Sequence, residues 1–141
     1  MSKYVFSNEV LQVFLKKWVA ILSLQEWDIH AEICSEEYFT NKDCDGETLF
    51  LLSKAQATIH ILDPNDYPND ASFEQDMEIT LVHELLHLKY AGFQPPDDSP
   101  EHAYFERGIQ TTAKVLVGLC RESERFGTSR VGQGAVVAVP I

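Results

Sequence analysis

Residues 73–91 read FEQDMEITLVHELLHLKYA, and their apolar side chains recur at the spacing of one helix face. The apolar stripe consists of Met77, Leu81, Leu85 and Leu88. Ser72, followed three residues later by Gln75, predicts a capping box at the start of this helix. Gly92 and the pair Pro95-Pro96 predict its end. The segment is therefore predicted to be one well-bounded amphipathic helix.

The same segment contains the HExxH pattern His83-Glu84-Leu85-Leu86-His87. Residues four apart in a helix lie on one face, with Cβ atoms about 5–6 Å apart, so both imidazoles can reach one metal ion. Glu84 is then beside the open metal position, where a general base for the attacking water is needed. The alternative interpretation is a solvated helix face that carries these residues by chance. The position of the motif inside the predicted helix favours a metal site.

A catalytic zinc site needs a third protein ligand, and the candidates lie on a second predicted helix. Residues 100–122 predict this helix, with an apolar stripe of Phe105, Ile109, Ala113, Leu116 and Leu119. We favour Glu106, because it adjoins the stripe that must pack against the first helix. Glu101 is at the end of the helix, where side chains are poorly fixed. His102 lies one turn before Glu106, so it could bind the metal instead or donate a hydrogen bond into the cleft.

The remaining segments complete an α+β prediction. Residues 8–24 predict a helix with an apolar stripe of Val10, Phe14, Trp18 and Ile21. Residues 27–34 and 48–62 alternate apolar and polar side chains, which predicts strands, with a polar loop at residues 36–47 and a turn at residues 63–70. We expect an N-terminal helix and a small, mostly antiparallel sheet of about three strands. The HExxH helix and a C-terminal helix with the third ligand follow.

The length of 141 residues is that of a single domain, which we place at residues 1–126. Residues 127–141 contain three glycines and form a predicted tail. Within this tail, residues 135–139 are expected to form a short closing strand or to be mobile.

The net charge of −11 argues against nucleic acid or an anionic membrane surface as the partner, and weakly favours a basic one. The acidic residues are spread along the chain, so an ordinary solvated surface is the simpler interpretation. The N-terminus lacks the apolar core of a signal peptide, and no apolar run has the length of a membrane span. We therefore expect a cytoplasmic protein. Cys34, Cys44 and Cys120 lack a CxxC spacing and are expected to be buried free thiols.

HExxH followed by a glutamate in the next helix resembles the gluzincin arrangement of zinc peptidases. Glu106 lies nineteen residues after His87. The order of elements is similar to that of the minigluzincins and of small metallopeptidases encoded by phages and prophages. Residues 106–113 are also similar to the glutamate-bearing helix of the ImmA/IrrE peptidases, and the resemblance as a whole covers residues 27–120. Gluzincins often carry an aspartate one turn after the ligand glutamate, where this chain has Gln110, a neutral acceptor for a ligand histidine.

The resemblance implies a zincin-like fold and a zinc-dependent metallopeptidase that acts on a peptide or protein substrate. It also implies the cytoplasm of a bacterial host that carries a phage or prophage. His83, His87 and Glu106 would bind one Zn²⁺, and Glu84 would be the general base. The strand at residues 55–61 would be the sheet edge that pairs with an extended peptide.

Further groups could assist this reaction. Candidate donors to the developing oxyanion are His102, Tyr104, Tyr90 and Tyr67. The first alternative to a peptidase is a non-catalytic zinc-binding regulatory or scaffold protein. The second is a structural domain in which the histidines only pack. Glu84 favours catalysis, because a structural zinc site needs no base.

Overall fold

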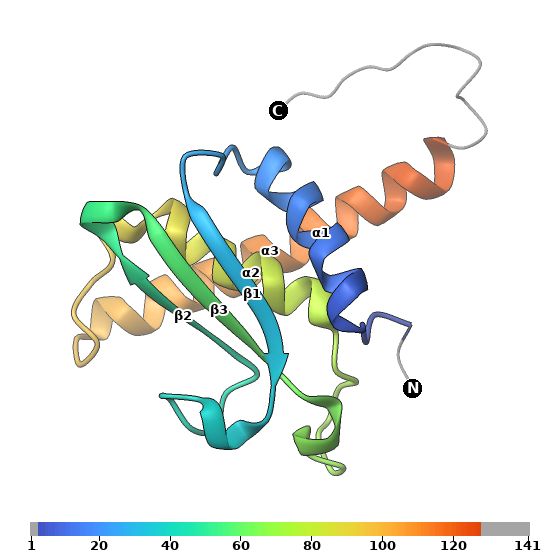
Figure 1. The fold of residues 1–141 in the computed structure, drawn as a ribbon, viewed down its shortest axis with the longest axis horizontal. Coiled ribbons are helices and arrows are strands. Elements are labelled where there is room, and N and C mark those ends of the chain that lie inside the picture. Colours follow the sequence, from blue (N-terminus) through green and yellow to red (C-terminus); the bar gives the residue numbers. More distant parts are fainter. Residues whose placement is uncertain (1–2, 128–141) are drawn as a thin grey trace.

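The computed structural model describes residues 3–127 of the chain, and its element order is that of an α+β fold (Figure 1). The elements are α1 (Asn8–Ile21), β1 (Asp28–Cys34), β2 (Gly46–Leu51), β3 (Gln56–Leu62), α2 (Met77–Lys89) and α3 (Pro100–Gly127). The predicted fold class, with an N-terminal helix, a three-stranded sheet and two further helices, is confirmed. The predicted tail at residues 127–141 lies outside the described residues, apart from Gly127, which ends α3.

β3 is the central strand of the sheet, with β1 on one side and β2 on the other. It pairs in parallel with β1 and antiparallel with β2. The sheet is therefore mixed, and the expectation of a mostly antiparallel sheet is wrong. The expectation that residues 55–61 form the sheet edge is also wrong, because residues 56–61 lie in β3, between the two other strands.

The sequence pattern predicts one extended segment over residues 48–62, but the structure divides it into the β2–β3 hairpin. A 3-10 turn at Leu52–Lys54 reverses the chain, and Ala55 follows it in the left-handed conformation with φ 50°. Glycine or asparagine usually marks such a position, so the alanine gives no turn signal. The continuous apolar run over residues 49–52 hides the turn further. The first strand of the hairpin, β2, also begins earlier than predicted, at Gly46, which lies in the segment predicted to be a loop.

α1 lies along the outer edge of β1 (Figure 1). The side-chain amide of Gln12 donates to the Ala31 carbonyl at 2.9 Å. The side-chain oxygen of Asn8 accepts from the Ile33 backbone N–H, also at 2.9 Å. These bonds satisfy main-chain groups at the edge of β1. Within residues 3–127, the other edge of the sheet, formed by β2, pairs with no further strand.

α2 packs against the sheet, and α3 packs against α2. The core between these layers includes Leu11, Leu15, Trp18, Ile59, Ile61, Leu81, Leu85, Ile109, Ala113 and Val117. The stripe predicted for α1 is confirmed in part, because Trp18 is buried and Phe14 packs against the core, whereas Val10 and Ile21 are exposed. Leu119, predicted for the α3 stripe, is exposed as well, and Val117 is buried in its place.

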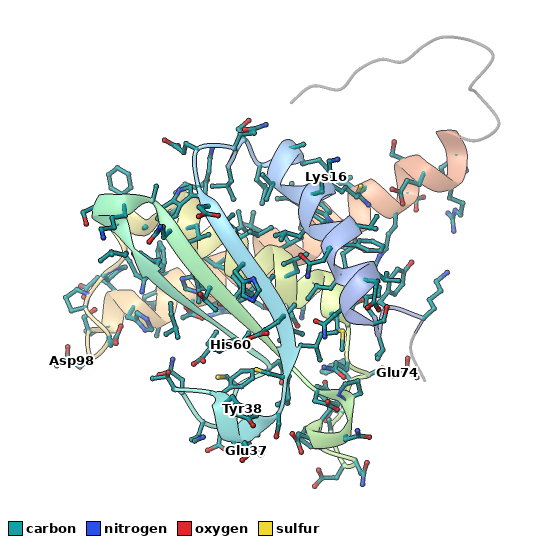
Figure 2. The ribbon with its side chains drawn as sticks, viewed as in Figure 1. Lys16, Glu37, Tyr38, His60, Glu74 and Asp98 are labelled. Atoms are coloured by element: carbon teal, nitrogen blue, oxygen red, sulfur yellow. The ribbon has the colours of Figure 1, made fainter. Side chains whose placement is uncertain are left out.

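Lys16, Glu37, Glu74 and Asp98 are exposed charged residues at the periphery of the molecule (Figure 2). Among the described helices, none has an apolar stretch of the length that a membrane crossing requires.

α2 begins later than the predicted capping box. Its N-cap is Asp76, whose carboxylate accepts from the Ile79 N–H at 3.1 Å, so the assignment of Ser72 as the cap is wrong. Gln75 is buried, and its side chain donates to the Leu62 carbonyl at 2.7 Å. Gln75, predicted to be part of a capping box, thus binds the end of β3 instead. This hydrogen bond fixes the start of the HExxH helix relative to the sheet.

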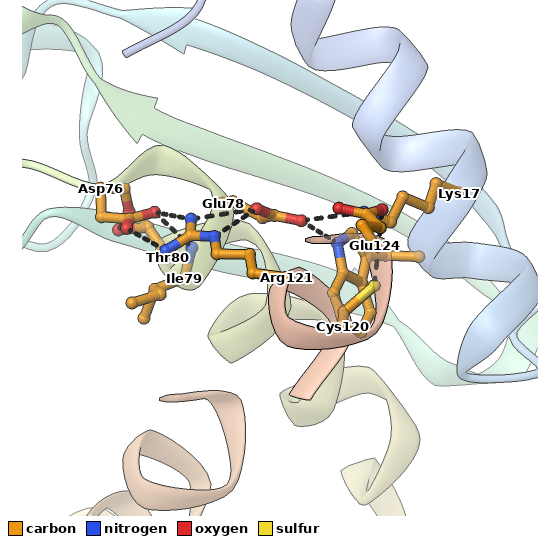
Figure 3. Close-up of polar contacts among 9 residues, drawn as sticks. Lys17, Asp76, Glu78, Ile79, Thr80, Cys120, Arg121 and Glu124 are labelled. Atoms are coloured by element: carbon orange, nitrogen blue, oxygen red, sulfur yellow. Dashed lines mark hydrogen bonds and ion pairs between the residues drawn. The ribbon is translucent and has the colours of Figure 1, made fainter. Parts of the chain in front are cut away.

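The first turn of α2 is held by a partly buried polar cluster, which we call the Glu78 cluster. It comprises Lys17, Trp18, Asp76, Glu78 and Arg121, and Figure 3 labels its charged members. Glu78 is 1% exposed. It accepts from the indole of Trp18 at 2.8 Å and lies between Lys17 of α1 and Arg121 of α3. Arg121 also pairs with the Asp76 cap at 3.0 Å. The cluster therefore joins all three helices near the start of the HExxH helix.

Candidate metal centre

The two histidines of the HExxH motif meet Glu106 where α2 and α3 pack together. Glu106 Oε1 lies 3.2 Å from His83 Nε2, and Oε2 lies 2.7 Å from His87 Nε2. One ligand atom from each of the three residues lies within 4.8 Å of the others, so this group could hold a metal ion. Glu101, an alternative third ligand in the sequence, is exposed and does not line the cleft described below. His102 lines the cleft but does not belong to the three-residue group.

Each histidine is oriented by a glutamine amide through its other ring nitrogen. His83 Nδ1 lies 2.7 Å from Gln110 Oε1, as the one-turn spacing from Glu106 predicts. His87 Nδ1 lies 3.1 Å from Gln94 Oε1. Because an amide oxygen only accepts, these contacts place the ring protons on Nδ1 and leave Nε2 available to a metal. Sequence reasoning missed Gln94, which lies in a loop without a motif.

Glu84 is buried beside these histidines, with only 6% of its surface exposed. The Thr48 hydroxyl donates to its Oε1 at 2.6 Å, and its Oε2 lies 4.0 Å from His83 Nε2. Burial raises the pKa of Glu84, while the neighbouring His83 and the Thr48 hydroxyl act in the opposite direction. Sequence reasoning missed Thr48 too, since the alternating pattern of a strand does not show which helix the strand touches.

The three-residue group opens into a cleft of about 660 Å³ formed by β2, α2 and α3. His102 lines this cleft, with its Nε2 3.6 Å from Asp97 Oδ1. The tyrosines considered as oxyanion donors do not line it. Tyr104 is 74% exposed, Tyr90 is exposed, and the Tyr67 hydroxyl donates to the Phe73 carbonyl at 2.9 Å. Of the donors proposed from the sequence, the structure brings His102 to the cleft.

The charges of the centre suit a cation. Burial alone would lower the pKa of His83 and of His87, but hydrogen bonds to Glu106 and the charge of Glu84 raise both pKa values above the ordinary one. The two imidazoles in turn hold the pKa of Glu106 well below its usual range. Glu106 is therefore ionised at neutral pH, and a cation bound between the three side chains would replace the protons they share.

The donor set allows an assessment of the metal. Two imidazole nitrogens and one carboxylate form the His₂Glu set of catalytic zinc sites, which leaves the fourth position open to water or substrate. Imidazole also suits other transition metals, so the donor set fits zinc without being specific to it.

The three cysteines do not belong to the metal-binding group. All three are partly exposed free thiols, so the expectation that they are buried is wrong. Cys44 lines the cleft.

Comparison of the chain with protein-family models, with curated proteins and with solved structures finds no match.

Proposed function

We propose that the protein is a zinc-dependent metallopeptidase of gluzincin type. The observation that carries this proposal is the convergence of ligand atoms from His83, His87 and Glu106 within 4.8 Å, with the Glu84 carboxylate in the same cleft. A structural zinc site is closed by four protein ligands, whereas three ligands and an adjacent carboxylate are the parts of a hydrolytic site.

In this proposal, each of the cleft residues has its own role in peptide hydrolysis. Zinc, when bound, polarises the scissile carbonyl and lowers the pKa of water at its open position towards about 7. Glu84 accepts the proton of the attacking water and delivers it to the leaving amine. His102 donates a hydrogen bond to the carbonyl oxygen as negative charge develops on it. Gln94 and Gln110 keep the ligand imidazoles in the correct orientation.

The edge of β2 is the proposed binding platform for an extended peptide. Residues 46–48 and Phe50 line the cleft, and within the described chain this edge of the sheet pairs with no other strand. An added strand would bind through main-chain hydrogen bonds, which give affinity with little selectivity for side chains. This assignment replaces the strand at residues 55–61, because β3 already pairs on both sides.

The alternative is a zinc-binding regulatory or scaffold protein without activity. The placement of Glu84 favours catalysis over this alternative. Burial of an ionisable carboxylate costs free energy, and a site that only binds metal does not require such a group.

The proposal is tested with the zinc-loaded protein and a mixed library of peptides, with cleavage detected by mass spectrometry. We expect the wild type to cleave and Glu84→Gln to retain one zinc ion while cleavage falls at least about 100-fold. Glu74→Gln is the matched control, since Glu74 is exposed and lies away from the cleft (Figure 2). A zinc-loaded wild type that leaves every peptide intact would favour the regulatory alternative. Equal rates for wild type and Glu84→Gln would remove Glu84 as the base.

A further inference from the structure

β2 contacts the Glu84 carboxylate through Thr48, and Gly46 on the same face of the strand lies close to α2. Thr48 Oγ1 donates to Glu84 Oε1 at 2.6 Å and also lies 3.3 Å from the Glu84 backbone carbonyl. Two residues earlier, a Cβ added at Gly46 would lie 3.3 Å from Glu84 Oε2 and 2.6 Å from the Thr80 methyl carbon. Gly46 thus permits the close approach of β2 to α2 that brings the Thr48 hydroxyl to Glu84.

The residue between them anchors the strand from its opposite face. Glu47 is 3% exposed, and its carboxylate accepts from the backbone N–H groups of Thr40 and Asn41. It also lies 2.7 Å from His60 Nδ1 on the neighbouring strand β3. Side chains alternate between the two faces of a strand, so fixing Glu47 on one face fixes Gly46 and Thr48 on the other.

The two oxygens of Glu84 consequently have different surroundings. Oε1 is bound by Thr48, whereas Oε2 lies 4.0 Å from His83 Nε2 and accepts no hydrogen bond from the described residues. A general base needs one oxygen directed at the attacking water, and a carboxylate without a lateral partner can rotate away from it.

We propose that Thr48 is a positioning residue that holds Oε1 of Glu84 so that Oε2 faces the metal group. This inference rests on the proposed function, in which Glu84 is the base. It gives β2 two roles, because the strand would bind the substrate main chain through its edge and align the base through a side chain. Binding and alignment would then depend on the same fixed element.

The experiment compares Thr48→Val, which removes the hydroxyl at nearly constant volume, with Thr48→Ser, which retains it. Thr58→Val is the matched control, because Thr58 lies in β3 and does not line the cleft. The measurements are zinc affinity, kcat and KM, and the affinity of zinc-loaded protein for acetohydroxamate. A hydroxamate that chelates zinc shares its proton with the neighbouring base, so its affinity reports the alignment of Glu84 without turnover.

We expect Thr48→Val to lower both kcat and acetohydroxamate affinity by about tenfold or more, with zinc affinity and KM within about threefold of wild type. Thr48→Ser should restore both quantities to within about threefold, and Thr58→Val should leave them unchanged. If Thr48→Val does not fold, Thr48→Ala takes its place, since it differs from Thr48→Ser only in the hydroxyl.

Unchanged acetohydroxamate affinity in Thr48→Val would overturn the positioning role while leaving the peptidase proposal intact. An equal loss in Thr48→Ser would also overturn it, because the effect would then not depend on the hydroxyl. A wild type that binds zinc and acetohydroxamate but cleaves no peptide would contradict the proposed function alone, and the comparison of Thr48 variants by acetohydroxamate would still decide the positioning role.

Discussion

The histidines of the proposed metal centre, His83 and His87, contact the neutral amides of Gln110 and Gln94 instead of carboxylates. A carboxylate in this position makes the imidazole a stronger ligand, whereas an amide mainly fixes its orientation. We therefore infer a correctly oriented metal centre whose affinity is lower than a carboxylate-supported one would have.

Alanine substitution of the two glutamines tests this inference. Gln94→Ala and Gln110→Ala should each weaken zinc binding by about tenfold or more, because the imidazole loses its orienting acceptor. Gln110→Glu should strengthen zinc binding above the wild-type value. Competition with a chromophoric chelator measures the affinities. The exposed Gln25→Ala is the control, and a Gln110→Ala protein that matches it would show that the amide does not support the ligand.

The pKa shifts of the centre predict the pH dependence of chelator-treated protein. His83 and His87 have raised pKa values, so their stabilising effect is complete below their ordinary pKa of 6.5 and is lost as the pH rises through the raised values. Glu106 has a lowered pKa, so its effect is complete above the ordinary 4.5 and is lost as the pH falls towards the lowered value. The contribution of the three residues is therefore largest between these two ordinary values.

Urea unfolding of wild type and Glu106→Gln from about pH 4.5 to pH 9 measures that contribution. The difference in unfolding free energy should be largest near pH 5.5 and should shrink as the pH rises above the raised histidine values. Zinc affinity should rise as the pH rises through the raised pKa values of the two histidines, because zinc competes with the histidine protons. A difference that grows steadily up to pH 9 would contradict the assigned shifts.

The residues that could be predicted from the sequence are those whose chemistry requires a fixed spacing. His83 and His87 must be four apart on a helix, and Glu106 must adjoin the apolar stripe of the helix that packs there. Thr48 and Gln94 could not be predicted, because their contacts arise only when a strand and a loop pack against α2.

At the scale of elements, the helices could be predicted from a fixed spacing of apolar residues, whereas the hairpin could not. α2 and α3 have long periodic stripes, and α3 starts at Pro100 as predicted. The β2–β3 hairpin lacks a glycine or proline signal at its turn, and parallel pairing with β1 has no local sequence signature. The edge strand of the proposed substrate site was therefore not predictable from the pattern alone.

The Glu78 cluster, which joins α1, α2 and α3, gives a prediction for stability. Glu78→Gln removes the buried charge that Arg121 and Lys17 share, and we expect the free energy of unfolding to fall by about 3 kcal/mol. Glu124→Gln, at the exposed end of the same ion-pair network, should cost less than about 1 kcal/mol. Urea denaturation measures both variants. A loss in Glu78→Gln no larger than that in Glu124→Gln would show that the Glu78 cluster does not join the helices energetically.

At the scale of the whole molecule, α1 lies along one edge of the sheet (Figure 1). Residues of α2 and α3 line a cleft beside the other edge, which β2 forms. The site combines Thr48 from β2, the histidines from α2 and Glu106 from α3. The net charge of −11 suits a cation at this site and weakly favours a basic substrate, although charge alone does not select one.

The metal centre itself is tested most directly by anomalous X-ray scattering at the zinc edge from crystals of protein loaded with one equivalent of zinc. We predict a single strong peak about 2.0–2.2 Å from Nε2 of His83, Nε2 of His87 and a carboxylate oxygen of Glu106. Glu106→Ala crystals prepared in the same way should show a much weaker peak there. No peak between these three residues in the wild type, or a peak held by other side chains, would contradict the assignment.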